Sequence, residues 1–296
     1  MSNITPLDRY LIGDNPFIGV NHLSQQRARE NQNRLNSVKI LGIIEAAMNS
    51  GAQGLLMSTH PLMYDVLKQM RSKADGPTFG LYPLLPYAQE YVRRATEKGV
   101  IGLAREVLAE TGLSALVRGL SIASMDPERI LRAYVDTELD ILFKNAPRRA
   151  VLRAVLFHEV ITDLAVSFEA DQLLKGYVNH ILDKYHVRPG FATRNFERFV
   201  AFAEKTGMMM DEIVILTPLN KVGFQMNPSK EACERTLDRL GVTNVIAMSI
   251  LASGILNLDD ALKYLGEHAS IKSFVVGVST EVHARETFSQ MNRALG

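Results

Sequence analysis

The sequence predicts an α/β protein, a (β/α)8 or TIM barrel with an extra helical insertion between its third and fourth strands. Short apolar runs of β type alternate with amphipathic helical segments along almost all of the 296 residues. Eight such runs are present, and they are mostly apolar on both faces, as strands between a barrel interior and a shell of helices should be. Alternation of strand and helix implies parallel strands joined by right-handed crossovers. An open doubly wound sheet is the alternative, disfavoured because no GxGxxG follows the first strand.

The predicted strands are short and regularly spaced. They are YLIGDN (10–15), GLLMST (54–59), TFGLYP (78–83), AVLFHE (154–159), RPGFAT (188–193), EIVILTP (212–218), NVIAMSI (244–250) and SFVVGVS (273–279). Three of the helical segments between them, SVKILGIIEAAMNSG, NFERFVAFAEKTG and SKEACERTLDRLG, close on Gly51, Gly207 and Gly241. Glycine is the residue expected just past a helix C-terminus.

The third strand–helix unit departs from this regular alternation. Residues 97–153 have helical periodicity throughout, including an amphipathic helix that Asp126 and Pro127 should start. We expect this insertion either to cover the mouth of the barrel as a lid or to bury a face against a second subunit. A polar connection, 22–37, should cross the top of the barrel. Without a repeat or linker, residues 1–296 are predicted to form one domain.

Composition excludes several classes of protein. Lys+Arg 33 against Asp+Glu 32 gives a net charge of +1, so no broad field favours nucleic acid or a membrane surface. Cys233 is the single cysteine, which excludes an internal disulfide and a cysteine-built metal site. No apolar run reaches the ~18 residues of a membrane span, and the start lacks the apolar core of a signal peptide. We expect a cytoplasmic protein that binds a small molecule; a homo-oligomer remains open.

Barrel enzymes carry their active sites at the C-terminal ends of the strands, and the predicted strands here end in polar residues. This polar ring comprises Asp14, Asn15, Ser58, Thr59, His60, Tyr64, Tyr82, His158, Glu159, Thr193, Arg194, Asn195, Asn220, Lys221, Ser249, Ser253, Ser279 and Thr280. His158 ends an apolar strand, so it either faces a substrate or closes the top of the core. His60, His158 and Glu159 could form a metal site, but neither HxH nor HExxH spacing is present, and we expect no metal.

The stretch VVGVSTEVHARETF, 275–288, predicts an anion site. Glycine lets the backbone approach a ligand, and the first N–H groups of a helix lack partners inside the helix. Gly277, Ser279, Thr280 and Arg285 would then bind a phosphate, with Arg285 on the second turn of the helix. The alternative is that Thr280 only caps the last helix.

These motifs resemble those of the aldo/keto reductases. AMSILASGIL resembles the seventh strand and turn of that family, and VVGVSTEVHARETF its last strand and phosphate loop, with Ser249, Gly254, Ser279, Arg285 and Glu286 on matching positions. VLFH resembles the fourth strand, whose histidine would be His158, and MSTHPLMY places Tyr64 at the catalytic tyrosine.

The resemblance implies a cofactor and roles for these residues. Tyr64 would donate a proton and His158 would orient the carbonyl, with His60 and Lys221 as further catalytic candidates. NADP or NAD would bind at Ser249, Gly254, Gly277, Ser279, Thr280 and Arg285. The substrate would meet Asn15, Thr59, Glu159, Arg194, Asn195 and Asn220.

The catalytic set is incomplete. The family's aspartate after the second strand is Thr59 here, and its lysine after the third strand is missing, because FGLYPLLPYAQEY offers only Tyr82 and Tyr87. Ala192 and Thr193 replace the polar pair of the fifth strand, and Thr287 stands where an asparagine is expected.

Three functions are therefore open. The first is an NAD(P)H-dependent reductase acting on a small carbonyl or phosphorylated metabolite, with Arg194 or Lys221 in place of the missing lysine. The second is an aldolase or lyase that forms a Schiff base on Lys221 with a sugar phosphate. The third is a barrel that binds a ligand without catalysis.

Overall fold

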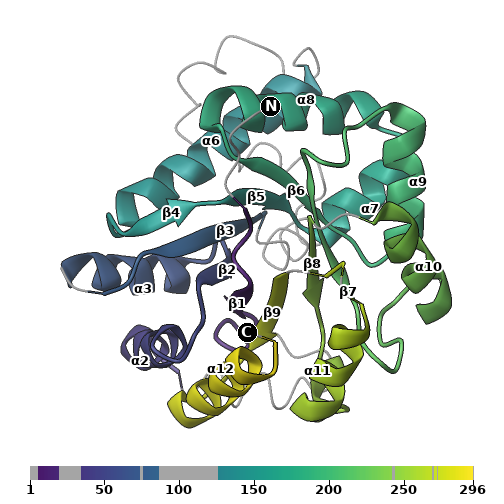
Figure 1. Ribbon diagram of the computed structural model, residues 1–296. Helices are drawn as coiled ribbons and strands as arrows, with labels where there is room; N and C mark the ends of the chain where they lie inside the picture. The colour runs from purple at the N-terminus through teal and green to yellow at the C-terminus, as the bar shows by residue number, and fades with distance from the viewer. Residues whose placement is uncertain are drawn as a thin grey trace.

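The strands form a closed parallel barrel surrounded by helices (Figure 1). The computed structural model describes residues 6–19, 35–73, 76–86, 126–241, 244–268, 270–271 and 273–295. The strands are β1 (Tyr10–Gly13), β2 (Gly54–Ser58), β3 (Phe79–Leu85), β4 (Ala150–Leu152), β5 (Ala154–Phe157), β6 (Arg188–Ala192), β7 (Val214–Pro218), β8 (Val245–Met248) and β9 (Ser273–Gly277). The helices are α2 (Ser37–Met48), α3 (Pro61–Ser72), α6 (Pro127–Asn145), α7 (Glu159–Ser167), α8 (Asp171–Tyr185), α9 (Phe196–Thr206), α10 (Lys230–Leu240), the 3-10 turn η2 (Ala252–Gly254), α11 (Leu258–Glu267) and α12 (Glu281–Leu295).

The hydrogen-bonded ladder closes on itself. β1 pairs in parallel with both β2 and β9, β2 pairs with β3, and the ladder continues through β5, β6, β7 and β8 back to β9. This confirms the predicted (β/α)8 barrel and rules out the open doubly wound sheet. The eight strands of the barrel overlap the eight predicted runs.

β4 and β5 together form one interrupted barrel strand. β4 pairs with Phe79–Leu81 of β3, and β5 pairs with Leu84 and Leu85 of the same strand. Between them Arg153 still donates its N–H to the Leu81 carbonyl at 3.0 Å. The interruption lets the Arg153 side chain form an ion pair with Asp8, at 3.4 Å from Nε to Oδ2, below the start of β1.

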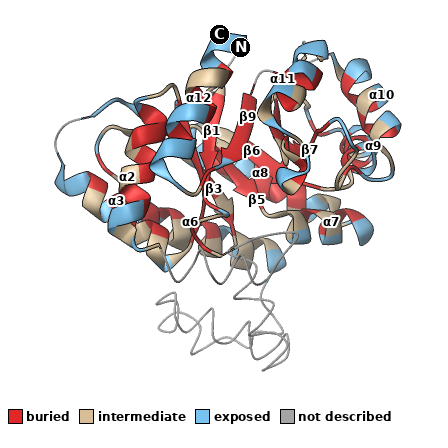
Figure 2. Cartoon of the chain, turned by 90° about the horizontal axis from the view of Figure 1, so that it is seen from below, coloured by how far each residue is buried: buried red, intermediate tan, exposed pale blue. Residues whose placement is uncertain are grey.

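Two apolar layers stabilise the barrel. Alternate strand residues fill its interior, among them Leu11, Leu56, Leu156 and Ile246. The intervening residues face outward and join the apolar faces of the helices in a larger core. Figure 2 shows this arrangement, with buried strands and helices that are buried on one face and exposed on the other.

Local sequence sets the helix ends. Gly207 and Gly241 cap α9 and α10 in the left-handed conformation, with φ of 72° and 59°, as predicted. α2 instead ends at Met48 with Asn49 as C-cap, and Gly51 follows at φ 116°. Asp126 caps α6 by accepting the Glu128 N–H at 3.1 Å, and Pro127 occupies the first turn.

The structure describes only the second part of the predicted helical insertion, from residue 126 onward. Residues 97–125 of it, and the connection 22–34, lie outside the described residues. α6 contacts α3 and α8, and so occupies the place of the barrel helix between the third and fourth barrel strands. Helical structure ends at Asn145, earlier than predicted, because Pro147 disfavours the helical conformation for Ala146. A short helix not predicted from the sequence, α7, precedes the barrel helix α8. Within the described ranges, no helix has the length and apolarity to cross a membrane.

Candidate functional site

The C-terminal ends of the strands bring many of the predicted site residues to one face, which we call the mouth. Asp14 follows β1 and is only 4% exposed, whereas the neighbouring Asn15 is exposed. The Asp14 carboxylate accepts the Ser58 N–H at 2.7 Å and so ties the end of β1 to β2. Burial raises the pKa of Asp14 to about 6, and its hydrogen bonds with Ser58 only partly oppose this shift.

His158 lies at the end of β5, in register with the inward-facing Ala154 and Leu156. It caps α7, with Nδ1 accepting the Val160 N–H at 3.3 Å. A neutral imidazole has one N–H, so the proton must lie on Nε2. Burial lowers the pKa of His158; the Glu159 carboxylate raises it and the Arg194 guanidinium lowers it. His158 is thereby a hydrogen-bond donor through Nε2.

A charged pair lies beside His158. Glu159 accepts a hydrogen bond from Arg194 Nη2 at 2.8 Å, and its other oxygen is 3.4 Å from His158 Nε2. The Arg194 side chain is 32% exposed and the Glu159 side chain 16%. The mouth therefore offers a cation and a histidine donor on adjacent strand ends, bridged by one carboxylate.

Asp163 of α7 holds the loop that carries Arg194. Its carboxylate accepts the Thr193 hydroxyl at 2.5 Å and the Asn195 amide at 3.0 Å. The Arg194 N–H lies 3.4 Å from the same carboxylate. Thr193 and Asn195 thus serve to shape the loop after β6.

Tyr64 lies in the first turn of α3, and its hydroxyl points toward α6. It donates a hydrogen bond to Glu138 Oε2 at 3.0 Å, and the Thr59 hydroxyl also bonds to this carboxyl. Burial raises the pKa of Glu138 above its ordinary value. His60 caps α3, with Nδ1 accepting the Leu62 N–H at 3.1 Å, which matches the role of His158 at α7.

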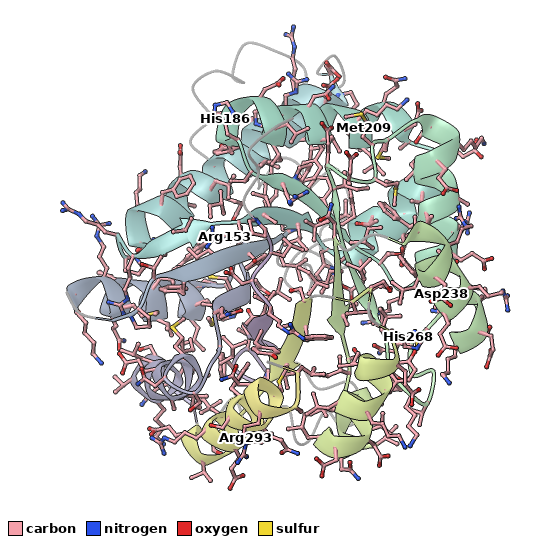
Figure 3. All side chains as sticks on the ribbon, viewed as in Figure 1. Arg153, His186, Met209, Asp238, His268 and Arg293 are labelled. Atoms are coloured by element: carbon pink, nitrogen blue, oxygen red, sulfur yellow. The ribbon has the colours of Figure 1, made fainter. Side chains whose placement is uncertain are left out.

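Tyr82 does not belong to the mouth. β3 continues to Leu85, and the Tyr82 hydroxyl donates to Asp8 Oδ2 at 2.8 Å, at the N-terminal end of the barrel. Arg153, labelled in Figure 3, completes this cluster. The prediction failed because the strand was expected to end at residue 83. Tyr87 lies outside the described residues.

Lys221 and Asn220 follow β7 and differ in environment. Lys221 forms an ion pair with Asp260 at 2.7 Å, with its side chain 50% exposed. A Schiff-base lysine needs a desolvated site that lowers its pKa, so this environment does not support the lyase hypothesis. The side chain of Asn220 is buried and bonds both the N–H and the carbonyl of Phe224, which shapes the loop.

The turn after β8 has an unusual backbone. Ser249 and Ser253 have φ of 55° and 61°, and Gly254 has φ 91°. Non-glycine residues are uncommon in this region. Gly254 is exposed, and a Cβ built on it would meet nothing within 4 Å. Its backbone is therefore open to a ligand.

The turn after β9 lies next to the turn after β8, because β8 and β9 pair in parallel. The Thr280 hydroxyl accepts the His283 N–H at 3.1 Å, so Thr280 does cap α12. Arg285 is exposed and bonds Glu281 at 2.7 Å, and Ser279 is half-buried. A Cβ on Gly277 would lie 2.8 Å from Pro16 Cγ, so packing alone requires glycine there.

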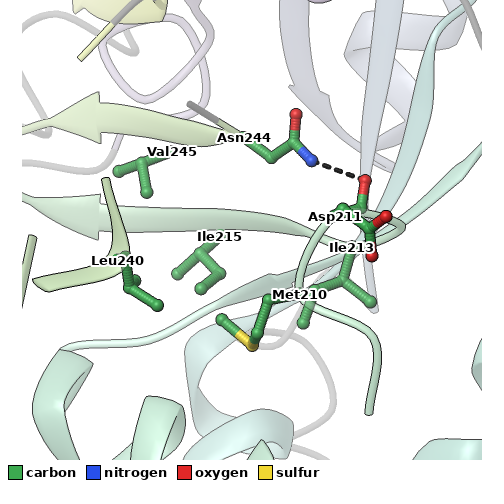
Figure 4. A pocket seen from close by; sticks show the side chains of 7 residues that line it. All are labelled: Met210, Asp211, Ile213, Ile215, Leu240, Asn244 and Val245. Carbon is green, nitrogen blue, oxygen red and sulfur yellow. Dashed lines mark hydrogen bonds between the residues drawn. The ribbon is translucent and has the colours of Figure 1, made fainter. Parts of the chain in front are cut away.

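Metal ligands do not converge among the described residues of the mouth, and a cavity lies elsewhere in the barrel. No three His, Cys, Asp or Glu side chains converge as metal ligands would in the described part of the chain. A cavity of about 230 Å³ lies at the opposite end, below the starts of β7 and β8 (Figure 4). Apolar side chains such as Ile213 and Val245 line most of it, beside the hydrogen bond from Asn244 to the Asp211 carbonyl.

Two residues of the site, Glu138 and Asp163, were not predicted from the sequence. Both lie inside helices, where a carboxylate has the appearance of an ordinary surface residue. Asp163 could have been found from its position one turn after Glu159, on the face that continues the mouth. Nothing in the local sequence distinguishes Glu138.

Solved structures share this fold. A Pseudomonas aeruginosa protein that is assigned to the aldo-keto reductases matches with a TM-score of 0.59 at 11% identity, over 97% of this chain and 91% of its own. An aldo/keto reductase from Brucella melitensis matches with a TM-score of 0.51 at 11% identity, over 88% and 85% of the two chains. No protein-family model and no curated protein sequence matches the chain. The chain therefore shares its barrel fold with these proteins, as the sequence predicted.

Proposed function

We propose that the chain is a reductase that uses NADPH or NADH to convert a small carbonyl compound into an alcohol. The observation that carries the proposal is the hydrogen bond that the Val160 N–H donates to Nδ1 of His158. Because the Val160 N–H occupies Nδ1, the imidazole presents Nε2–H at the mouth. Burial lowers the pKa of His158 and so favours the neutral ring, which can donate to a carbonyl oxygen through its one N–H.

The turns after β8 and β9 would bind the phosphates of the dinucleotide. Gly254 has an open backbone, and Ser249 and Ser279 add hydroxyl groups in neighbouring turns. Within the described part of the chain, Arg285 is held by an exposed pair with Glu281. Such pairs are worth at most about 1 kcal/mol, so a phosphate can replace Glu281 as its partner. When bound, the nicotinamide supplies the hydride.

Tyr64 would supply the proton. Tyr64 is half-buried and follows β2 by a short turn that begins with Thr59. Arg194 would bind a negatively charged or polar part of the substrate from the end of β6. Asn15 and Asn195 would line the substrate on either side.

Reduction of a panel of small aldehydes, ketones and 2-oxo acids by NADPH and NADH tests this function. We expect turnover with at least one substrate, and a loss of about 100-fold or more in kcat for Tyr64→Phe, the size typical of a lost general acid. His158→Gln should raise KM and lower kcat. Lys221→Met is the matched control, and it should leave the rate unchanged. Loss of activity in the control with retention in Tyr64→Phe would contradict the proposal.

A further inference from the structure

The hydrogen bond from Tyr64 to Glu138 raises the question of how the phenol would regain its proton. No acid lies at the end of β3, where Leu84 and Leu85 are apolar, and the next residue, Pro86, is apolar too. A free phenol has a pKa near 10 and is a weak acid at neutral pH. A proton donor in contact with its oxygen would remove this difficulty.

Glu138 meets this requirement by geometry. It lies on α6, which contacts α3, and its Oε2 is 3.0 Å from the Tyr64 hydroxyl. The Thr59 hydroxyl bonds to the same carboxyl and fixes its position. Among the described residues, these two groups, from α3 and from the end of β2, hydrogen-bond to Glu138. The nearby Asp136 faces α8 instead, where it bonds His180, Tyr185 and Lys184.

We propose that Glu138 is a positioning residue that holds the proton behind Tyr64 and returns it to the phenol. The inference rests on the proposed reductase function. In reduction, the carbonyl carbon receives hydride from the nicotinamide and the carbonyl oxygen receives the Tyr64 proton. The Tyr64 oxygen takes the proton of the Glu138 carboxylic acid, and the Glu138 carboxylate is then protonated by water. In alcohol oxidation each proton moves in the reverse direction.

The protonation state of Glu138 then selects the direction of the reaction. The acid form is required for reduction and the carboxylate for oxidation. Burial of Glu138 raises its pKa and so extends the acid form toward neutral pH. Reduction should fall as the pH rises through this pKa, and oxidation should rise over the same range.

The first test compares the pH profiles of kcat in the wild type, Glu138→Gln and Glu138→Asp. Glu138→Gln keeps a hydrogen-bonding group of the same size but has no proton to relay. We expect it to lose about tenfold or more in kcat and to lose the pH-dependent limb, with unchanged NADPH affinity. Glu138→Asp should restore part of the limb. Glu128→Gln, which removes a carboxylate from the same helix, is the matched control. A Glu138→Gln variant with the wild-type profile would overturn the proposal.

The second test does not require turnover. The ¹³Cζ signal of Tyr64, in protein labelled at tyrosine, is assigned with Tyr64→Phe and followed against pH. We expect an inflection in the acid range that is absent in Glu138→Gln and present in Glu128→Gln. The absence of this inflection in the wild type overturns the proposal. If the inflection is present but no carbonyl compound is reduced, the coupling stands and the reductase function fails.

Discussion

Burial shifts the pKa values of Asp14 and His158 at the ends of β1 and β5, and each shift favours the uncharged form. It raises the pKa of Asp14 and lowers that of His158. Both residues lie at strand ends, where they meet polar backbone groups rather than bulk water. Groups of this kind in a barrel mouth are candidates for proton transfer or for binding neutral ligands.

Asp14→Asn should stabilise the protein at neutral pH. The pKa of Asp14 rises from 3.8 unfolded to about 6 folded, so the wild type loses stability as the pH rises from about 4 to about 6. The corresponding penalty above this range is about 3 kcal/mol. Asparagine can accept the same Ser58 N–H and carries no such penalty.

Urea unfolding at pH 4 and pH 7 measures this effect. The advantage of Asp14→Asn over the wild type should grow between the two pH values. Asp140→Asn, which removes an exposed carboxylate from α6, is the control for lost charge. An advantage that stays constant with pH would show that folding does not shift the pKa of Asp14.

Neighbouring charges should shift the pKa of His158 in opposite directions. Arg194→Gln removes a cation and should raise the pKa, whereas Glu159→Gln removes an anion and should lower it. NMR titration of the imidazole measures both. Shifts of the same sign would mean that the pair does not lie beside His158 as described.

Helix α7 positions several of the side chains at the mouth. Its cap is His158, its first turn carries Glu159, and its second turn carries Asp163, which holds the loop after β6. A single short helix thus fixes the positions of residues from two strand ends.

Asp163→Ala should loosen this loop. It leaves the Thr193 hydroxyl and the Asn195 amide without their acceptor, which costs about 1–3 kcal/mol for a buried group. Urea unfolding measures the loss, and hydrogen exchange at 193–195 should become faster. Asp171→Ala on α8, which removes a half-buried carboxylate paired with Lys175, provides the control. Unchanged exchange in Asp163→Ala would contradict the role of Asp163.

The strands and helices could be predicted from the sequence more completely than the contacts of the candidate site. Alternating apolar runs and glycine stops at Gly207 and Gly241 are local signals, and they sufficed for the barrel. The contact from Tyr64 to Glu138 joins two residues that lie 74 positions apart in the sequence. No local sequence pattern therefore encodes it. Tyr82 was predicted at the C-terminal end of the barrel, and this was wrong. The apolar sequence of β3 does not mark where the strand ends, and the strand continues to Leu85. The roles of the predicted cofactor and substrate residues stay predictions.

The two ends of the barrel carry different sets of polar residues. Asp8, Tyr82 and Arg153 close the N-terminal end, and the mouth carries the polar ring. This division is general among barrel enzymes.

Tyr82→Phe should therefore destabilise the barrel without changing the mouth. Asp8 loses a hydroxyl donor, and the Asp8 N–H loses its acceptor, at a cost of about 1–3 kcal/mol. Thermal unfolding measures the cost, and cofactor affinity should equal that of the wild type. A loss of affinity without a loss of stability would contradict the separation.

The most direct test of the reductase proposal is a titration with NADPH and with NADH, followed by the fluorescence of the cofactor. The chain has Trp 0, so no tryptophan emission interferes. We expect saturable binding that Arg285→Ala weakens by about tenfold, as for a lost charged hydrogen bond. Arg293→Ala, at the far end of the same helix (Figure 3), should have no effect. Absence of binding by either cofactor, or equal weakening by both substitutions, would contradict the proposal.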